Sequence, residues 1–243
     1  NGGEDLEDFI LVGLSYANGE TPEYSRRRDY TPTPNGDKEA VTDMPGRVPV
    51  YGEAEGYRKF ILEEVFPLVA QNYRADMKRA IYAGHSFGGL FGLHVLFTDP
   101  SMFEKYIIGS PSLWFDRRVA FATERSYAKA HADLPAKLFM AVASYETLNF
   151  SSDNPRYNKT VDMVRDLQAM EHVLESRHYK SLEMKTIIIP DEDHLTVFPA
   201  VITRGLKWAL PPERVGNGLI DRAYGEGASA PAPALPPAHR AQP

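Results

Sequence analysis

Apolar residues are arranged along the chain in short continuous runs and in longer stretches with helical spacing. A continuous run bounded by polar or glycine residues is typical of a buried strand, and apolar positions three or four residues apart are typical of a helix. The first run, residues 9–14 (FILVGL), predicts a buried central strand. Residues 53–73 predict an amphipathic helix that Pro67 should kink, because proline cannot donate the helical hydrogen bond. The remaining patterns predict, in order, strand 79–83, helix 87–97, strand 105–109, helix 117–131, strand 137–143, helix 155–177, strand 182–189 and helix 196–210.

This alternation predicts an α/β protein with a mostly parallel central sheet and helices on both faces. Residues 15–49 are rich in proline, glycine, aspartate and arginine and show neither periodicity, so we expect a long surface loop. Residues 226–243 are biased toward proline and alanine and contain almost nothing to bury, which predicts a disordered tail. We therefore expect one folded domain over residues 1–225, followed by the tail.

Composition excludes several classes of protein. The 243 residues, 43% of them hydrophobic, are sufficient for one sizeable core. A formal net charge of −6, without a long lysine or arginine run, argues against nucleic-acid binding. The lack of cysteine excludes disulfides and a thiol nucleophile but fits either redox compartment, so it predicts no localisation. No apolar stretch approaches the roughly 18 residues of a membrane span, and nothing in the pattern predicts an oligomeric state.

One motif indicates chemistry. Gly84-His85-Ser86-Phe87-Gly88 matches G-x-S-x-G and lies between a predicted strand and a predicted helix, which is the context of a nucleophile elbow. Such a turn points the serine out of the sheet, and small flanking residues let strand and helix pass closely. We therefore predict Ser86 as a nucleophile. The backbone N–H of Phe87 would face the developing oxyanion, where one donor lowers the barrier by about 3 kcal/mol.

A serine nucleophile needs a base, and the chain has seven histidines. His194 follows the predicted strand 182–189 across a short acidic turn, which places it at the carboxyl end of a sheet strand, where open α/β sheets build their sites. His85 lies inside the elbow, but we expect it to point away from the side chain of Ser86. The other five lie in predicted helices or in the tail, so His194 is the predicted base.

The carboxylate that orients the base should lie between Ser86 and His194 in the chain. Glu146 fits best, because it directly follows the predicted strand 137–143, next to the strand that leads to His194. Asp153 is the alternative, and Asp162 lies less suitably in a predicted helix. The acidic turn before His194 lacks the His-x-x-x-His pair or cysteine of a metal site, so we expect neither metal nor cofactor.

The motifs together resemble a known family. The chain is similar to the putative-esterase family of α/β-hydrolases, on its siderophore-esterase side, and the resemblance implies the α/β-hydrolase fold, metal-independent ester hydrolysis, Ser86 and His194 as catalytic residues and Glu146 as the acid. It also suggests that Arg26 binds a substrate carboxylate or oxyanion, unless it is a solvated surface arginine, and that Trp114 lines the pocket, unless it belongs to the core. The resembling segments are Val12-Gly13-Leu14, Arg26 with Asp29-Tyr30-Thr31-Pro32, Gly84 to Phe91, Ser110-Pro111-Ser112-Leu113-Trp114, and Asp193-His194.

One feature of the family has no counterpart here. Its members carry additional strands before the one that matches residues 9–14, and the loop after the last of these provides a second oxyanion N–H. We expect that Asn1 begins a truncated fragment; the alternative is a substitute N–H near Ser15 and Tyr16. Truncation would leave a sheet edge uncovered.

The sequence thus predicts a serine carboxylic-ester hydrolase that acts through an acyl-enzyme on a small-molecule ester. A siderophore-type ester or lactone is suggested by the family alone. Two alternatives stay open: an acyltransferase with the same triad, and a non-catalytic binding domain of the same fold. The identity of the substrate depends on loops such as 15–49, whose path no pattern predicts.

Overall fold

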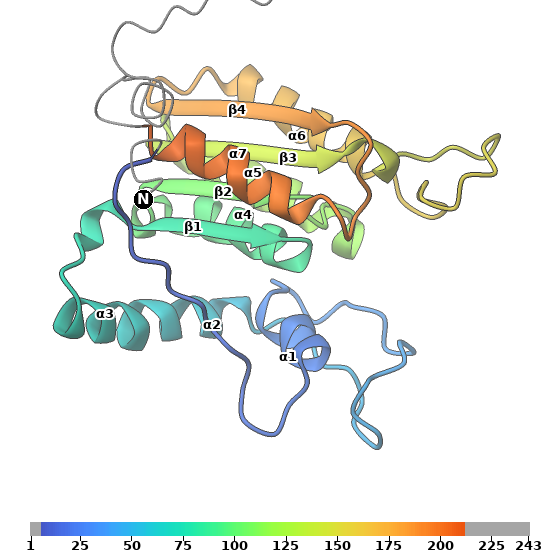
Figure 1. The fold of residues 1–243 in the computed structure, drawn as a ribbon, viewed down its shortest axis with the longest axis horizontal. Helices are drawn as coiled ribbons and strands as arrows, with labels where there is room; N and C mark the ends of the chain where they lie inside the picture. Colours follow the sequence, from blue (N-terminus) through green and yellow to red (C-terminus); the bar gives the residue numbers. More distant parts are fainter. Residues whose placement is uncertain (1–5, 212–243) are drawn as a thin grey trace, which may run out of the picture.

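The computed structural model describes residues 6–211, in which four parallel strands form one sheet between two layers of helices (Figure 1). The strands lie side by side in chain order, and a helix follows each of them. The predicted α/β architecture is confirmed. The strands are β1 (Ile81–His85), β2 (Lys105–Gly109), β3 (Ala136–Ala143) and β4 (Leu182–Ile189), and the helices after them are α4 (Phe87–Thr98), α5 (Phe115–Ala130), α6 (Met163–Arg177) and α7 (Phe198–Ala209).

The core has two parts because successive strand residues point to opposite faces of the sheet. Ile107 of β2 and Phe139 of β3 are fully buried on the face that α7 covers. Their neighbours Tyr106 and Ile108 are buried on the other face, against α4, α5 and α6. Each such side chain contributes about 1.5–3 kcal/mol of burial free energy, so both helical layers are held firmly on the sheet.

The predicted helix 53–73 forms a continuous helical stretch with a local change of winding. It consists of α2 (Ala54–Phe60), the π-helical turn η1 (Ile61–Val65) and α3 (Phe66–Asn72). Pro67 lies in the first turn of α3 and cannot donate a backbone hydrogen bond, so the wider π turn directly before it accommodates the proline. A short 3-10 turn, η2 (Met77–Arg79), leads into β1, and another, η3 (Pro100–Met102), leads into β2.

The predicted strand 9–14 is wrong. These residues form no strand in the structure, and Phe9, Ile10 and Val12 are about half exposed while Leu11 is 85% exposed. An apolar run indicates a preference for burial, but a strand also needs a neighbouring strand with which its backbone groups form hydrogen bonds. Within residues 6–211, the sheet begins at β1 and no strand pairs with this segment.

The predicted loop 15–49 contains a helix, α1 (Pro22–Asp29). Periodicity could not find it, because its residues are mostly polar and it is only eight residues long. Its start signals are nevertheless readable: Thr21 is the N-cap and accepts a hydrogen bond from the Tyr24 N–H, and Pro22 occupies the first turn. The rest of the segment is irregular, as expected.

The predicted helix 155–177 begins eight residues later than expected, at Met163. Asp162 caps it by accepting a hydrogen bond from the Arg165 N–H. The preceding residues are turns whose side chains bind other loops; Asn158, for example, donates to the carbonyl of Glu146. Tertiary contacts therefore decide where this helix starts.

Two predictions fall outside the described residues: the domain boundary at residue 225 and the tail at 226–243. Within residues 6–211, no helix is both long enough and apolar enough to cross a membrane.

Candidate active site

Four loops meet at one edge of the sheet, because the carboxyl ends of parallel strands lie together. Ser86 directly follows β1, and residues 110–114 follow β2. The 3-10 turn η4 (Ser144–Glu146) follows β3, and His194 lies in the turn after β4. The predicted nucleophile, base and acid thus come from the ends of strands in one sheet, whereas Arg26 lies in α1.

Ser86 lies in a sharp turn between β1 and α4, with φ 60° and ψ −120°. Such a conformation is strained for a residue with a side chain and costs about 1–3 kcal/mol. The Ser86 N–H donates to the carbonyl of Gly109 (3.0 Å), which ties the turn to β2. A Cβ at Gly84 would lie 2.5 Å from Tyr82 Oη, and one at Gly89 would lie 3.0 Å from the Gly109 carbonyl. Gly84 of the motif and Gly89 directly after it are therefore required by the close approach of strand and helix.

A hydrogen-bonded chain joins Ser86, His194 and Glu146. Ser86 Oγ lies 3.0 Å from His194 Nε2, and His194 Nδ1 lies 2.5 Å from Glu146 Oε1. An ionised carboxylate only accepts hydrogen bonds, so Nδ1 carries the proton and Nε2 is left to accept from the serine hydroxyl. The arrangement is that of a general base whose tautomer a carboxylate sets.

Glu146 is held by two further donors. The hydroxyl of Ser110 and the backbone N–H of Ala143 both donate to Oε2, at 2.5 and 2.8 Å. The side chain is 99% buried, so its carboxylate depends on these bonds for stabilisation. Of the carboxylates considered in the sequence, Asp153 is exposed and Asp162 caps α6; neither contacts His194.

Ser110 and Ser112 are site residues that reasoning from sequence did not select. Ser112 is buried, its Oγ lies 3.4 Å from Ser86 Oγ, and its N–H donates to the Ser86 carbonyl (3.2 Å). Ser110, also buried, has φ 39° and directs its hydroxyl to Glu146. The signal that could have found them is their position directly after β2, between the strand ends that carry the nucleophile and the acid.

The loops that carry Glu146 and His194 are cross-linked. The Tyr145 N–H donates to the carbonyl of Glu192 (3.1 Å). Arg156 pairs with Asp193 (2.8 Å), donates to the carbonyl of Asp191 (2.7 Å) and stacks 4.3 Å above the Tyr145 ring. The hydrogen bond from Arg156 lowers the pKa of Asp193, which keeps this carboxylate ionised. Arg156 therefore joins the loop of His194 (the histidine loop) to the loop of Glu146 (the acid loop).

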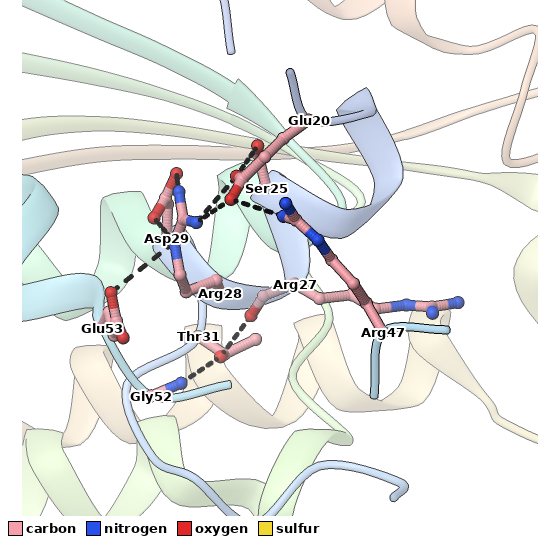
Figure 2. A network of polar contacts seen from close by, with 9 residues as sticks. All are labelled: Glu20, Ser25, Arg27, Arg28, Asp29, Thr31, Arg47, Gly52 and Glu53. Atoms are coloured by element: carbon pink, nitrogen blue, oxygen red, sulfur yellow. Dashed lines mark hydrogen bonds and ion pairs between the residues drawn. The ribbon is translucent and has the colours of Figure 1, made fainter. Parts of the chain in front are cut away.

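A polar network fixes α1, the helix that carries Arg26 (Figure 2). Arg28 pairs with Glu20 and Asp29, both at 2.7 Å, and these carboxylates raise its pKa. Thr31 donates to the Arg27 carbonyl and accepts from the N–H of Gly52, which joins the end of α1 to the segment before α2.

Arg26 is half-buried, and its side chain, unlike those of the two arginines after it, makes no hydrogen bond or ion pair with any of the described residues. Its charge acts on His85 and contributes to lowering the pKa of that histidine. The charge of Arg26 is therefore uncompensated within the described part of the chain. Its predicted role in binding substrate stays a prediction.

Phe87 is the first residue of α4, where a backbone N–H has no acceptor inside the helix. Trp114 packs with its ring 6.0 Å from that of Phe87 and is 39% exposed, so it does not belong to the core. Ser15 and Tyr16 form no hydrogen bond with Ser86, Phe87 or His194 in the structure as described. Among residues 6–211, no three potential ligand side chains gather as a metal site would require.

Comparison with known proteins decides the family. The family model described as "Putative esterase" matches residues 22–170, which is more than half of the chain. The chain belongs to this esterase family. The match covers α1, the elbow, β3 and Glu146, and it ends within α6. The predicted family, fold and enzyme class are confirmed.

Two curated relatives extend the comparison. Ferri-bacillibactin esterase BesA of Bacillus subtilis is 32% identical over 208 residues, which cover 84% of this chain and 68% of the relative. Siderophore enterobactin esterase of Emericella nidulans is 35% identical over 148 residues, or 59% of this chain and 47% of that protein. The esterase thus spans about two thirds of the first relative and about half of the second.

Solved structures show the same fold. The BES protein from Bacillus cereus superposes with a TM-score of 0.67 at 25% identity, over 85% of this chain and 74% of that one. Siderophore hydrolase EstA from Aspergillus nidulans superposes with a TM-score of 0.57 at 28% identity, over 75% and 65% of the two chains.

Proposed function

We propose that this esterase cleaves carboxylic esters through an acyl-enzyme, with Ser86 as nucleophile, His194 as general base and acid, and Glu146 as the orienting carboxylate. The observation that carries the proposal is the hydrogen-bonded chain from Ser86 Oγ through both nitrogens of His194 to the buried Glu146. Each group has the partner that its role requires.

In the first step, His194 Nε2 takes the hydroxyl proton as Ser86 Oγ attacks the ester carbonyl carbon. The carbonyl oxygen becomes an oxyanion, for which the N–H of Phe87 at the start of α4 is the proposed donor. The C–O bond to the leaving group then breaks, and His194 returns the proton to the departing alkoxide. Water repeats the sequence on the acyl-enzyme: His194 takes its proton, the acid is released and the serine hydroxyl is restored. Glu146 stabilises the imidazolium throughout.

We further propose that the substrate is a siderophore-type ester or lactone. Two curated relatives are named as esterases of ferri-bacillibactin and of enterobactin. The surroundings of Ser86 suit a substrate with anionic and aromatic groups, because Arg26 supplies a positive charge and Trp114 and Phe87 supply aromatic surface near the elbow.

The test measures hydrolysis of p-nitrophenyl acetate and butyrate, and of a catecholate siderophore triester, by the wild type and Ser86→Ala. We expect hydrolysis by the wild type and its loss, by about 10³-fold or more, in the folded variant. Hydrolysis that persists in Ser86→Ala would contradict the proposed nucleophile. Product analysis with added alcohol distinguishes the alternative reaction: a dominant transesterified product would identify an acyltransferase that uses the same residues.

A further inference from the structure

His85, the residue before the proposed nucleophile, has no part in the mechanism described above. Its side chain nevertheless points to the catalytic loop. His85 Nε2 lies 2.9 Å from the backbone carbonyl oxygen of His194, and the two imidazole rings have their centroids 4.7 Å apart. The sequence-based expectation that His85 points away from the Ser86 side chain did not anticipate this contact.

The hydrogen bond defines the state of the ring. A carbonyl oxygen only accepts, so the proton of a neutral His85 must be on Nε2, and Nδ1 is then unprotonated. Nδ1 is buried and has no hydrogen-bond partner among the described residues. Phe198 packs 5.5 Å from the ring on the α7 side, and a Cβ at Gly109 would lie 3.2 Å from Nδ1. The hydrogen bond from Nε2 to the His194 carbonyl is therefore the one polar contact of the ring among the described residues.

We propose that His85 is a positioning residue for the catalytic histidine: its Nε2–H holds the main chain of His194, so that the imidazole stays between Ser86 and Glu146. The inference rests on the proposed roles of Ser86 and His194. His194 lies in an irregular turn between β4 and α7, where no helix or strand holds its backbone. The hydrogen bond from His85 to the carbonyl of His194 joins the elbow directly to this turn and so fixes the base relative to the nucleophile.

The charge state of His85 supports this role. Burial lowers its pKa to about 4, His194 and Arg26 act in the same direction, and Glu146 and the hydrogen bond to His194 oppose them. At neutral pH the ring is therefore uncharged. Because it is weakly basic, it is a poor acceptor for the proton of Ser86, and because it is uncharged, it does not repel the imidazolium that His194 becomes.

The test compares His85→Gln, which keeps a side-chain N–H, with His85→Leu, which cannot donate. His94→Leu is the matched control, because His94 is also largely buried with a lowered pKa but lies in α4, where its Nε2 is 3.8 Å from Glu55 and neither ring nitrogen is bonded to the turn of His194. We measure kcat and KM for p-nitrophenyl butyrate and the rate at which a fluorophosphonate labels Ser86.

We expect His85→Leu to lower kcat and the labelling rate by about 10- to 100-fold, with KM changed less than about threefold, because small misplacement of a base is costly. His85→Gln should recover most of the loss, and His94→Leu should behave as the wild type. The proposal is overturned if folded His85→Leu keeps kcat within about twofold of the wild type, if His85→Gln is equally impaired, or if His94→Leu loses as much.

A measurement on the wild type decides the matter even if His85→Leu does not fold. In ¹⁵N-histidine spectra, His85 should be neutral with its proton on Nε2 between pH 5 and 8. A proton on Nδ1, or a charged ring at pH 6, overturns the proposal. This spectrum also distinguishes failure of the proposed function from failure of the His85 proposal. A wild type that hydrolyses no ester would contradict the proposed function but would leave the spectrum of His85 unchanged.

Discussion

At the scale of single residues, the proposed site depends on conformations that most side chains avoid. Ser86 and Ser110 both have positive φ, 60° and 39°, and each directs its hydroxyl to another member of the site. Strain of this kind persists only where the surroundings impose it, and here hydrogen bonds to neighbouring strands do so: Ser86 N–H donates to Gly109 and Ser110 N–H donates to Ala141.

Substitution Glu146→Gln tests the orienting carboxylate. Two donors, Ser110 Oγ and the Ala143 N–H, face Oε2, so the amide oxygen should occupy that position and leave the NH₂ facing His194 Nδ1. His194 would then carry its proton on Nε2 and could not accept from Ser86. We expect kcat to fall by about 10³- to 10⁴-fold with stability little changed. Steady-state kinetics check this, with the exposed Asp153→Asn as control; a loss below about tenfold would argue that Glu146 does not set the tautomer.

At the scale of elements, each strand end contributes one part of the site, and the loops need to be joined to act together. Arg156 contributes most to this: it comes from a third segment, before α6, and binds both the histidine loop and Tyr145 beside the acid. Its side chain is 36% exposed, so its ion pair with Asp193 should add little to global stability. We expect its main effect to be on how the loop of Glu146 and the loop of His194 are placed relative to each other.

Substitution Arg156→Ala should therefore separate activity from stability. We expect kcat to fall by about 3- to 10-fold, because Glu146 and His194 lose a link between their loops, while the midpoint of urea unfolding moves little. Arg165→Ala, which removes an exposed arginine at the start of α6, is the matched control and should leave both quantities unchanged. Equal kcat in both variants and the wild type would show that the backbone bond from Tyr145 to Glu192 is sufficient.

At the scale of the whole molecule, the titration of His85 makes the free energy of unfolding depend on pH. The pKa of His85 is lowered from 6.5 to about 4 in the folded protein, so the unfolded chain binds this proton at a higher pH. The free energy of unfolding should then decrease as pH falls from about 6.5 to about 4, by at most about 3 kcal/mol from this group. His94, whose pKa burial also lowers, acts in the same direction.

Urea unfolding at pH 7 and pH 4.5 measures this effect, with His85→Gln as the comparison. The wild type should lose more stability between the two pH values than the variant does, because glutamine does not titrate. Carboxylates also titrate in this range, but those that do not interact with His85 are common to both proteins and cancel in the difference. Equal losses would mean that His85 is already charged, or solvated, in the native protein.

The sequence by itself determined the alternation of strands and helices and the family, and it predicted three side chains of the site. Periodicity reports which residues must be buried, and the glycine-flanked Ser86 between a strand and a helix has few other uses. The strand order placed Glu146 and His194 after neighbouring strands, and the structure joins both to Ser86 by hydrogen bonds. The inferences about fold and family succeeded because they depend on local pattern and chain order, and the catalytic roles of the three side chains stay predictions.

Only the tertiary structure decided what depends on a partner distant in the chain. Residues 9–14 are apolar enough for a strand, but pairing needs a neighbour, and none of the described strands provides one. The roles of Ser110, Arg156 and His85 come from contacts across 36, 37 and 109 positions. A hydrogen bond forms only when two groups meet at the right distance and angle, and no property of either residue alone specifies that meeting.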